Sequence, residues 1–497
     1  MPTALRTRGF WVCVLALVLA FGFLGTRGIW DPDEGRYTNV ALNMLDSGDW
    51  LNPRRHHEVG HWTKPPLTYW AIASSVAVLG YNPWAARLPA AFAYLLSTWL
   101  VWRLARRLQP GTEHQAAVVY ATMLLPLGAS QLITTDYLLA AFETLALYAF
   151  VEALWGGGKE RDAGTLGWIA LMWMAFALAF MTKGPPALLP LLVVFAFNLL
   201  LPPAQRRRTL HWWGLALFVL LALPWYVAVI LDNPGLFEYF IGDEVVNRVT
   251  TNSFGRHGGW FGWLQVYVPT LLIGTLPWTA SLWRWLRALP ARVRRWHGDR
   301  AARGADASAL LVALWFLLPL LVFCFSQSRL PLYLLPLFAP IALAIAAQRQ
   351  SEGRGLPRWP WLAAWAGVLL ALKLGAALWP THKNAAEWAD AIRARTDAPV
   401  QEVVFLEDMA RYGLHLHLGA EVEKIALDPQ PQARFGPVND SDLAEELDER
   451  EPNVVWICKQ ERWGELRPRI EALGYRATAL GTPYRGRIIF RVEPAPH

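Results

Sequence analysis

The sequence is poor in charged residues, in cysteine and in the short motifs that mark many soluble enzymes. Only 17% of its 497 residues are charged, while 54% are hydrophobic and 28 are tryptophan. Neither a Walker loop nor a GxGxxG fingerprint occurs, so the sequence predicts no nucleotide-binding loop. The three cysteines, Cys13, Cys324 and Cys458, have no disulfide-framework or metal-binding spacing. A soluble globular enzyme and cysteine chemistry are therefore both disfavoured.

Long apolar runs recur through the first 380 residues. Each is long enough, once its flanks are added, to span a hydrocarbon core of roughly 30 Å as a helix. The first run follows Arg6 and Arg8 without a small-residue cleavage site, so we expect an uncleaved first helix. The sequence therefore predicts a polytopic membrane protein, with apolar runs at Phe10–Phe23, Ala116–Leu127, Leu166–Met181, Leu188–Leu201, Trp213–Leu231, Leu310–Phe325 and Leu362–Leu378.

The formal net charge of +7 comes from basic residues in short loops between these runs, not from one patch. That distribution indicates membrane orientation and argues against nucleic-acid binding. Leu67–Leu79 is too short for a comfortable span, and treating it as re-entrant brings every basic loop to the cytoplasmic side. We then expect about eleven crossings, with the N-terminus inside and the C-terminus outside. The inner loops carry Lys159/Arg161, Arg206–Arg208, Arg284–Arg303 and Arg349–Arg358.

The tail differs from the rest of the chain. Helix-like stretches at Ala385–Arg395, Asp442–Arg450 and Trp463–Leu473 alternate with β-branched runs at Val400–Leu406, Val454–Cys458 and Arg487–Val492. Such alternation is typical of a small α/β domain. The predicted fold is an all-α polytopic membrane domain over residues 1–380, followed by a small extracytoplasmic α/β domain over residues 381–497.

The segment Trp30–Tyr69 is the first long polar interval after a predicted membrane helix, and on this topology it lies outside. Charged groups beside hydrocarbon are costly, which makes such clusters candidates for function. Carboxylates also favour the first turn of a helix, and this structural interpretation stays open for Asp31 and Glu34. For Asp33 we favour function. Lys64, fixed before two prolines, suits an anion, and the candidate set here is Asp33, Glu34, Arg36, Tyr37 and Lys64.

Further polar residues fall at the outer ends of other runs. Each taken alone could be an interfacial anchor, but together they place acids and bases at one level of one membrane face. The loop Asp232–Trp260 adds two arginines that could meet a phosphate. These candidates are Asp136, Lys183, Arg329 and Tyr333, with Arg248 and Arg256 from the loop.

His57-Glu58-Val59-Gly60-His61 matches the HExxH pattern of zinc metalloproteases. That pattern works on a helix, where both histidines share one face, but Gly60 and the flanking prolines leave little room for one. A protease stays an alternative. Metal binding in another form, by His57, Glu58, His61 and His257, also stays open, so a divalent metal is the candidate cofactor.

The polar motifs resemble one family of membrane enzymes. Pro32-Asp33-Glu34-x-Arg36-Tyr37, Ser47-Gly48-Asp49-Trp50, Lys64-Pro65-Pro66, Asp136, Lys183-Gly184 and Leu330-Pro331-x-Tyr333 are similar to positions in the lipid A aminoarabinose transferases. Those enzymes belong with protein mannosyltransferases and oligosaccharyltransferases in the GT-C class of glycosyltransferases. The resemblance covers, with interruptions, residues from about 10 to 340.

The resemblance implies an inverting transfer of a sugar from a polyprenyl-phosphate donor to lipid A or a related envelope acceptor, at the periplasmic face of the bacterial inner membrane. It also implies that Asp33 is catalytic, that Asp136 is the second acidic position, and that Lys64 and Tyr333 contact the donor phosphate. The family's metal-associated glutamate before the Lys-Pro pair is Thr63 here. The alternatives are a protein O-glycosyltransferase of the same fold, the metalloprotease, and a transporter of lipid-linked sugars.

Overall fold

The computed structural model describes residues 3–156, 162–242, 258–431 and 433–495. The chain forms two compact units: Met1–Gly22 with Pro89–Lys373, and Phe23–Leu88 with Leu374–His497. The first polar segment thus belongs with the tail rather than with the apolar helices. The domain boundary expected at residue 380 puts the first polar segment and the tail in different domains. That division stays a prediction.

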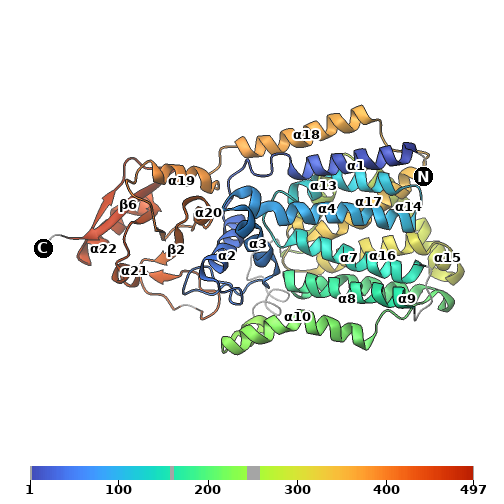
Figure 1. The fold of residues 1–497 in the computed structure, drawn as a ribbon, viewed down its shortest axis with the longest axis horizontal. Helices are drawn as coiled ribbons and strands as arrows, with labels where there is room; N and C mark the ends of the chain where they lie inside the picture. The colour runs from blue at the N-terminus through green and yellow to red at the C-terminus, as the bar shows by residue number, and fades with distance from the viewer. Residues whose placement is uncertain (1–2, 157–161, 243–257, 432, 496–497) are drawn as a thin grey trace. The chain divides into compact units, whose positions relative to one another are not determined.

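The first unit is helical, and several of its long helices run alongside one another (Figure 1). Apolar residues fill most positions of these helices, so their backbone groups are satisfied within each helix, as a bilayer requires. Its helices are α1 (Thr3–Phe21), α4 (Pro83–Leu108), α5 (Glu113–Thr122), α6 (Leu124–Ala129), α7 (Asp136–Trp155), α8 (Ala163–Lys183), η1 (Pro185–Leu188), α9 (Leu189–Leu200), η2 (Pro203–Gln205), α10 (Trp212–Asp232), α11 (Leu236–Tyr239), α13 (Gly262–Gly274), α14 (Thr279–Gly298), α15 (Arg300–Ala305), α16 (Ala307–Phe325), η4 (Pro331–Leu337), α17 (Phe338–Ser351) and α18 (Trp359–Leu378).

Within the described ranges, seven helical segments are long and apolar enough to cross a membrane. They are Pro83–Leu108, Asp136–Trp155, Ala163–Lys183, Trp212–Asp232, Ala307–Phe325, Pro331–Ser351 and Trp359–Leu378. Three shorter apolar helices accompany them, Leu67–Leu79 among them. The multi-pass helical fold is therefore confirmed, whereas the expected eleven crossings are not.

The apolar run predicted at Ala116–Leu127 does not form one helix. It divides into α5 and α6 at Met123, which has an extended backbone (φ −68°, ψ 141°). The indole N–H of Trp365 donates to the backbone carbonyl of Thr122 (2.9 Å). The indole N–H of Trp278 donates to the Thr122 hydroxyl (2.9 Å). Pro126, which lacks an N–H, lies in the first turn of α6, where no intrahelical donor is needed.

The second unit contains α2 (Asp33–Ser47), α3 (Leu67–Leu79) and the expected α/β tail. The tail consists of α19 (Ala385–Arg393), β1 (Glu402–Leu406), α20 (Leu414–Leu418), β2 (Glu421–Ala426), β3 (Ser441–Asp442), α21 (Leu443–Glu449), β4 (Val454–Lys459), η5 (Gln460–Arg462), α22 (Trp463–Ala472), β5 (Tyr475–Ala479) and β6 (Arg487–Pro494).

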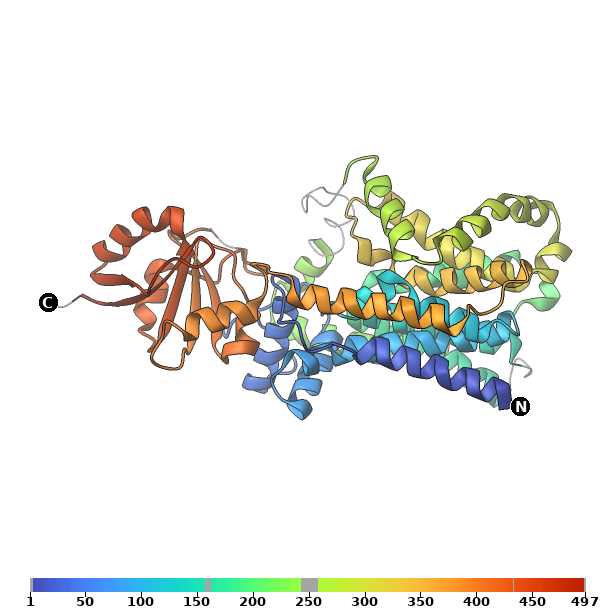
Figure 2. The same ribbon diagram turned by 90° about the horizontal axis from the view of Figure 1, so that it is seen from above.

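The six strands form one sheet in the order β3-β2-β1-β4-β6-β5, with helices on both faces (Figure 2). β3, β2, β1 and β4 pair in parallel. β6 pairs antiparallel with β4 on one side and with β5 on the other. Alternate residues of β1 enter two separate cores: Val403 and Phe405 pack with α19, whereas Val404 and Leu406 pack with α21 and α22. A strand buried on both faces needs a continuous apolar sequence, which explains why β1 was predictable.

The first polar segment is bonded to the tail inside this unit. The backbone N–H of Asp31 donates to the carbonyl of Lys383 (2.9 Å), and that of Ala385 donates to the carbonyl of Ile29 (2.8 Å). Asn39 and His415 join α2 to α20 through a 2.8 Å hydrogen bond. The tail therefore holds the segment that carries the predicted catalytic aspartate.

Candidate active site

The first turn of α2 presents Asp33 to the surface. Asp33 begins the helix directly after Pro32, and Gly48, with φ 73°, ends it in the left-handed region that glycine favours. The Asp33 side chain is 68% exposed, and its Oδ1 lies 2.7 Å from Nη2 of Arg36 one turn later. An accessible carboxylate beside a guanidinium can orient a ligand that carries both hydroxyl and phosphate groups.

Glu34 is buried and engaged with two arginines. Its two carboxylate oxygens accept hydrogen bonds from Arg27 (2.7 and 2.8 Å) and Arg87 (3.1 and 3.4 Å), and Oε2 also accepts one from the backbone N–H of Trp30 (2.9 Å). Burial opposes ionisation, but the two guanidinium groups outweigh it and lower the pKa of Glu34 to about 2. This geometry makes Glu34 a positioning residue that fixes the start of α2, in contrast to the substrate contact predicted from the sequence.

Asp31 is also buried. Its Oδ1 accepts a hydrogen bond from the backbone N–H of Gly413 (3.0 Å), which links it to the tail. Burial raises the pKa of Asp31 to about 8, although Gly413 and Arg411 favour its ionised form. Asp31 and Glu34 therefore support the exposed Asp33 between them.

Lys64, Tyr37 and His61 lie in the same unit. The Nζ of Lys64 donates to the carbonyl of Thr63 (2.6 Å), and the Thr63 hydroxyl lies 2.9 Å from Nε2 of His61. Tyr37 is buried and stacks on Tyr69, with ring centroids 5.9 Å apart. Thr63 thus offers no carboxylate where the resemblance implies a metal-associated glutamate, so no step of the reaction is assigned to a metal at that position.

Asp136, Lys183 and Tyr333 come together in the other unit. Asp136 begins α7, Lys183 ends α8, and the ammonium of Lys183 bonds directly to the Asp136 carboxylate. The same ammonium lies 4.5 Å from the centroid of the Tyr333 ring, a cation–π distance. The predicted convergence of these residues is thus present at one end of the α7–α8 pair.

Arg329 lies in this unit, but as a buried residue of a turn. Its Nη1 donates to the carbonyl of Gly259 (2.8 Å) and its Nη2 to that of Cys324 (2.9 Å). Both contacts close loops beside η4, which carries Tyr333. Arg248, Arg256 and His257 lie outside the described residues.

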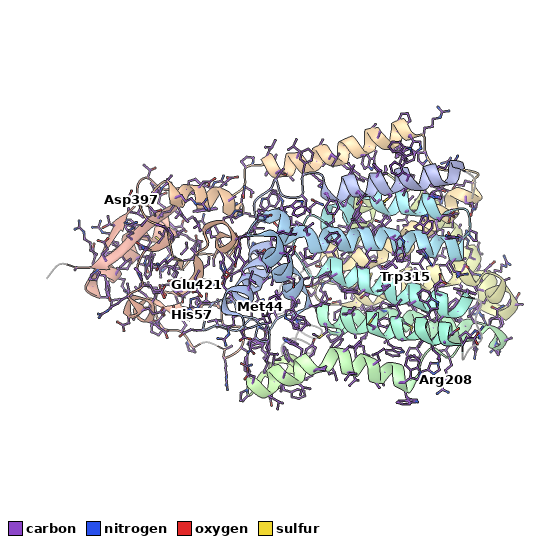
Figure 3. All side chains as sticks on the ribbon, in the orientation of Figure 1. Met44, His57, Arg208, Trp315, Asp397 and Glu421 are labelled. Carbon is purple, nitrogen blue, oxygen red and sulfur yellow. The ribbon has the colours of Figure 1, made fainter. Side chains whose placement is uncertain are left out.

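The HExxH match lies on irregular backbone, with no helix across His57–His61. His57 and Glu58 are exposed, whereas His61 turns away toward Thr63. The protease interpretation is therefore wrong, because its two histidines cannot share a helical face. His57 instead contacts Glu421 (Figure 3), its backbone N–H at 2.8 Å and its Nδ1 at 3.2 Å.

The fold brings several residues beside the candidates that were not predicted from the sequence. Arg27 and Arg87 escaped notice because only the folded chain pairs them with Glu34. Glu402, Glu421 and Glu423 approach His56 from the tail, although they lie more than 300 positions away in the sequence. The one sequence signal for this group was the position of His56, directly before the HExxH match.

Comparisons with known proteins agree with the resemblance. The family model for dolichyl-phosphate-mannose-protein mannosyltransferase matches residues 63–231. An undecaprenyl phosphate-α-4-amino-4-deoxy-L-arabinose arabinosyl transferase of Pseudomonas aeruginosa is 35% identical over 340 residues, 66% of this chain and 58% of the relative. Its counterpart in Edwardsiella ictaluri is 34% identical over 351 residues, 69% of this chain and 59% of the relative. The chain thus spans less than two thirds of the length of these relatives.

The fold is also known. The crystal structure of ArnT from Cupriavidus metallidurans bound to undecaprenyl phosphate superposes with a TM-score of 0.77, at 21% identity, covering 97% of both chains. This likeness includes the tail as well as the helices. The family match, the sequence relatives and the shared fold together make this chain similar to the ArnT-like group of the GT-C class.

Proposed function

We propose that this protein transfers a sugar from a polyprenyl-phosphate donor to lipid A or a related envelope glycolipid. The exposed Asp33–Arg36 pair at the start of α2 carries the proposal, because it lies where the ArnT-like motif predicts the catalytic aspartate. The names of the relatives support an undecaprenyl-phosphate donor and an aminoarabinose sugar. The protein O-glycosyltransferase alternative rests on the description of the family model that matches residues 63–231, and neither of the two sequence relatives carries that name.

The reaction breaks the bond between the anomeric carbon and the donor phosphate oxygen and forms a bond to an acceptor oxygen on the opposite face. The anomeric configuration inverts, and the polyprenyl phosphate leaves with the electron pair of the broken bond. Cationic groups near the phosphate stabilise this developing charge. Arg36 and Lys64, which lie in the same unit as Asp33, are the residues we assign to it.

The role of Asp33 follows from the acceptor. An acceptor hydroxyl must lose its proton, and Asp33 would take it as the general base. A lipid A phosphate is already ionised and needs no base, so Asp33 would then orient the acceptor through the Asp33–Arg36 pair. In both cases the carboxylate must be accessible, as the 68% exposure of its side chain allows.

Orientation in the membrane forms part of the proposal. Basic loops on the cytoplasmic side put the start of α2 and the tail in the periplasm, with the protein in the bacterial inner membrane. Lipid-linked sugars and lipid A are both available on that face.

The first test is the Asp33→Asn variant in a transfer assay with purified protein and a polyprenyl-phosphate sugar. Turnover should fall on the order of 10²- to 10⁴-fold while the protein stays folded. The exposed Glu58→Ala variant is the matched control, since a transferase should tolerate it. Turnover of Asp33→Asn close to that of the wild type would defeat the assignment.

The acceptor is identified in cells. Mass spectrometry of lipid A from cells with and without the gene should show loss of one sugar-sized increment. An unchanged lipid A profile would redirect the proposal to another envelope acceptor.

A further inference from the structure

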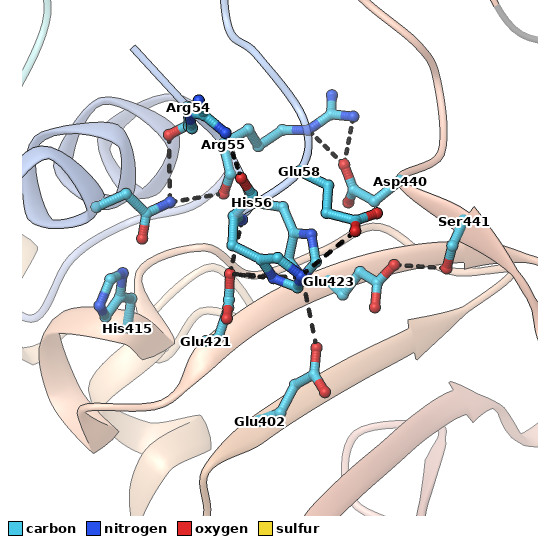
Figure 4. Close-up of polar contacts among 12 residues, drawn as sticks. Arg54, Arg55, His56, Glu58, Glu402, His415, Glu421, Glu423, Asp440 and Ser441 are labelled. Atoms are coloured by element: carbon cyan, nitrogen blue, oxygen red, sulfur yellow. Dashed lines mark hydrogen bonds and ion pairs between the residues drawn. The ribbon is translucent and has the colours of Figure 1, made fainter. Parts of the chain in front are cut away.

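A cluster of histidine and glutamate side chains lies in the second unit, apart from the residues assigned to transfer (Figure 4). His56 comes from the segment between α2 and α3, and the carboxylates come from two neighbouring parallel strands. Glu402 of β1 pairs in register with Glu421 of β2, and Glu423 lies two residues further along β2. Residues two apart on a strand point to the same face, so all three glutamates can face His56.

The side chains lie at ligand-sharing distances. One donor atom from each of His56, Glu402 and Glu423 lies within 4.8 Å of the others, and the same holds for His56, His57 and Glu421. The Nε2 of His56 is 3.4 Å from Oε1 of Glu421 and 3.8 Å from Oε1 of Glu402. Donor atoms that each lie about 2.0–2.2 Å from one Zn²⁺ are roughly 3–4 Å from one another. Small side-chain movements alone could therefore bring these atoms to the distances of a zinc site.

Two of the carboxylates are buried with oxygens that make no hydrogen bond. Glu402 is 2% exposed and Glu423 is 1% exposed, and the Oε2 atom of each is without a hydrogen-bond partner. The other oxygen of Glu423 accepts a bond from the Ser441 hydroxyl (2.5 Å), as a metal-bound carboxylate often does from its surroundings. A buried carboxylate oxygen without a donor is costly, and a cation would remove that cost.

The nearby Arg55 does not neutralise the negative charge of the glutamates in the cluster. Arg55 binds Asp440 through Nε (2.8 Å) and Nη2 (2.5 Å), and its remaining donors contact the carbonyl of Pro437. The buried carboxyl of Glu446 adds a further acid on the Glu423 side. The described residues thus place the carboxyl groups of Glu402, Glu421 and Glu423 beside the His56 imidazole.

We propose that His56, Glu402 and Glu423, with His57 and Glu421 completing the shell, bind a divalent transition-metal ion, with Zn²⁺ as the best match. Mixed imidazole and carboxylate donors suit Zn²⁺ better than Mg²⁺ or Ca²⁺, which prefer all-oxygen shells. The ion would join the segment that carries Asp33 to the sheet of the tail. Its role would be to stabilise the fold, because binding to the folded state alone raises stability.

The test uses the full-length, tag-free protein in detergent, stripped with a chelator and then titrated with ZnCl₂. Metal content after desalting should reach about one Zn²⁺ per chain, and the melting temperature should rise by several degrees. Glu402→Gln and Glu423→Gln keep the side-chain size and should each lower retained zinc at least tenfold. Glu493→Gln, an exposed glutamate on β6 outside the cluster, should retain it.

Two results would overturn the proposal: no zinc retained by the wild type, or equal retention by Glu423→Gln and Glu493→Gln. If the glutamine variants melt too low to assay, zinc protection of the His57 ring from diethyl pyrocarbonate in the wild type gives a second measurement. Lack of protection would count against the site. Neither readout depends on sugar transfer, so failure of the proposed function would leave this test intact.

Discussion

Replacing Glu34 by glutamine keeps the size of the side chain but removes the negative charge between Arg27 and Arg87. The carboxylate is 3% exposed, and both arginines are buried, so the variant leaves two guanidinium groups without their counter-ion. Breaking a buried ion pair in this way costs about 3–5 kcal/mol. The pKa of Glu34, lowered from 4.5 to about 2, gives an independent value of about 3 kcal/mol.

The pH dependence follows from the direction of that shift. Because the folded state holds the proton less tightly than the unfolded state, the stabilisation is complete above the ordinary pKa of 4.5 and is lost as pH falls toward 2. The wild type should lose about 1 kcal/mol of this contribution by pH 4 and about 2 kcal/mol by pH 3. Glu34→Gln has no such slope, so the two proteins should converge in acid.

Thermal unfolding in detergent, followed by tryptophan fluorescence between pH 3 and pH 7, measures both effects. At pH 7 a loss of about 3 kcal/mol corresponds to a melting temperature roughly 6–12 °C lower for a unit of 150–250 residues. Glu493→Gln, an exposed glutamate in the same unit, is the matched control and should melt like the wild type. A melting temperature of Glu34→Gln equal to that of the control would refute the reasoning.

Three further substitutions test the buried carboxylates of Asp31 and Asp136. Because the pKa of Asp31 is raised to about 8, its stabilising neutral form is lost as pH rises, at up to about 1.4 kcal/mol per pH unit between 4 and 8. Asp31→Asn keeps the acceptor for Gly413, so its melting temperature should equal or exceed that of the wild type at pH 8, and a lower value would contradict the burial argument. Lys183→Met should cost about 3–5 kcal/mol by isolating the Asp136 carboxylate, and adding Asp136→Asn should recover part of that loss without restoring transfer. Additive losses of melting temperature in this double variant would show that the pair is not coupled.

The elements predicted from the tail sequence are those buried on both faces or strongly amphipathic. β1, β4 and β6 were found because each contains a short apolar or β-branched run, such as Val403–Leu406 in β1. β2 was missed because Glu421-Val-Glu-Lys-Ile-Ala carries three charges. Two of those charges are the glutamates that face His56, so the feature that hid the strand is the one that builds the cluster.

The helical region shows a similar limit. Apolar length predicted the long helices, since a continuous run specifies a buried helix whatever its neighbours are. It could not predict the break at Met123, where Trp278 and Trp365 supply the hydrogen bonds that make an interruption tolerable. Those partners lie about 150 and 240 positions further along the chain.

The candidate site residues also differ in whether their partners could be predicted from the sequence. Asp136 and Lys183 could be paired from sequence, because α7 and α8 have nearly equal lengths, 20 and 21 residues, joined by a short connection. In an antiparallel pair of equal helices, the first residue of one must meet the last residue of the other. No comparable rule links Glu34 to Arg87, which lies 53 positions away on another helix. A carboxylate in the first turn of a helix looks the same in sequence whether it binds substrate or holds two arginines. Only the burial of Glu34 beside the exposure of Asp33 separates these roles, and that contrast makes Asp33, not its neighbour, the residue to test for transfer.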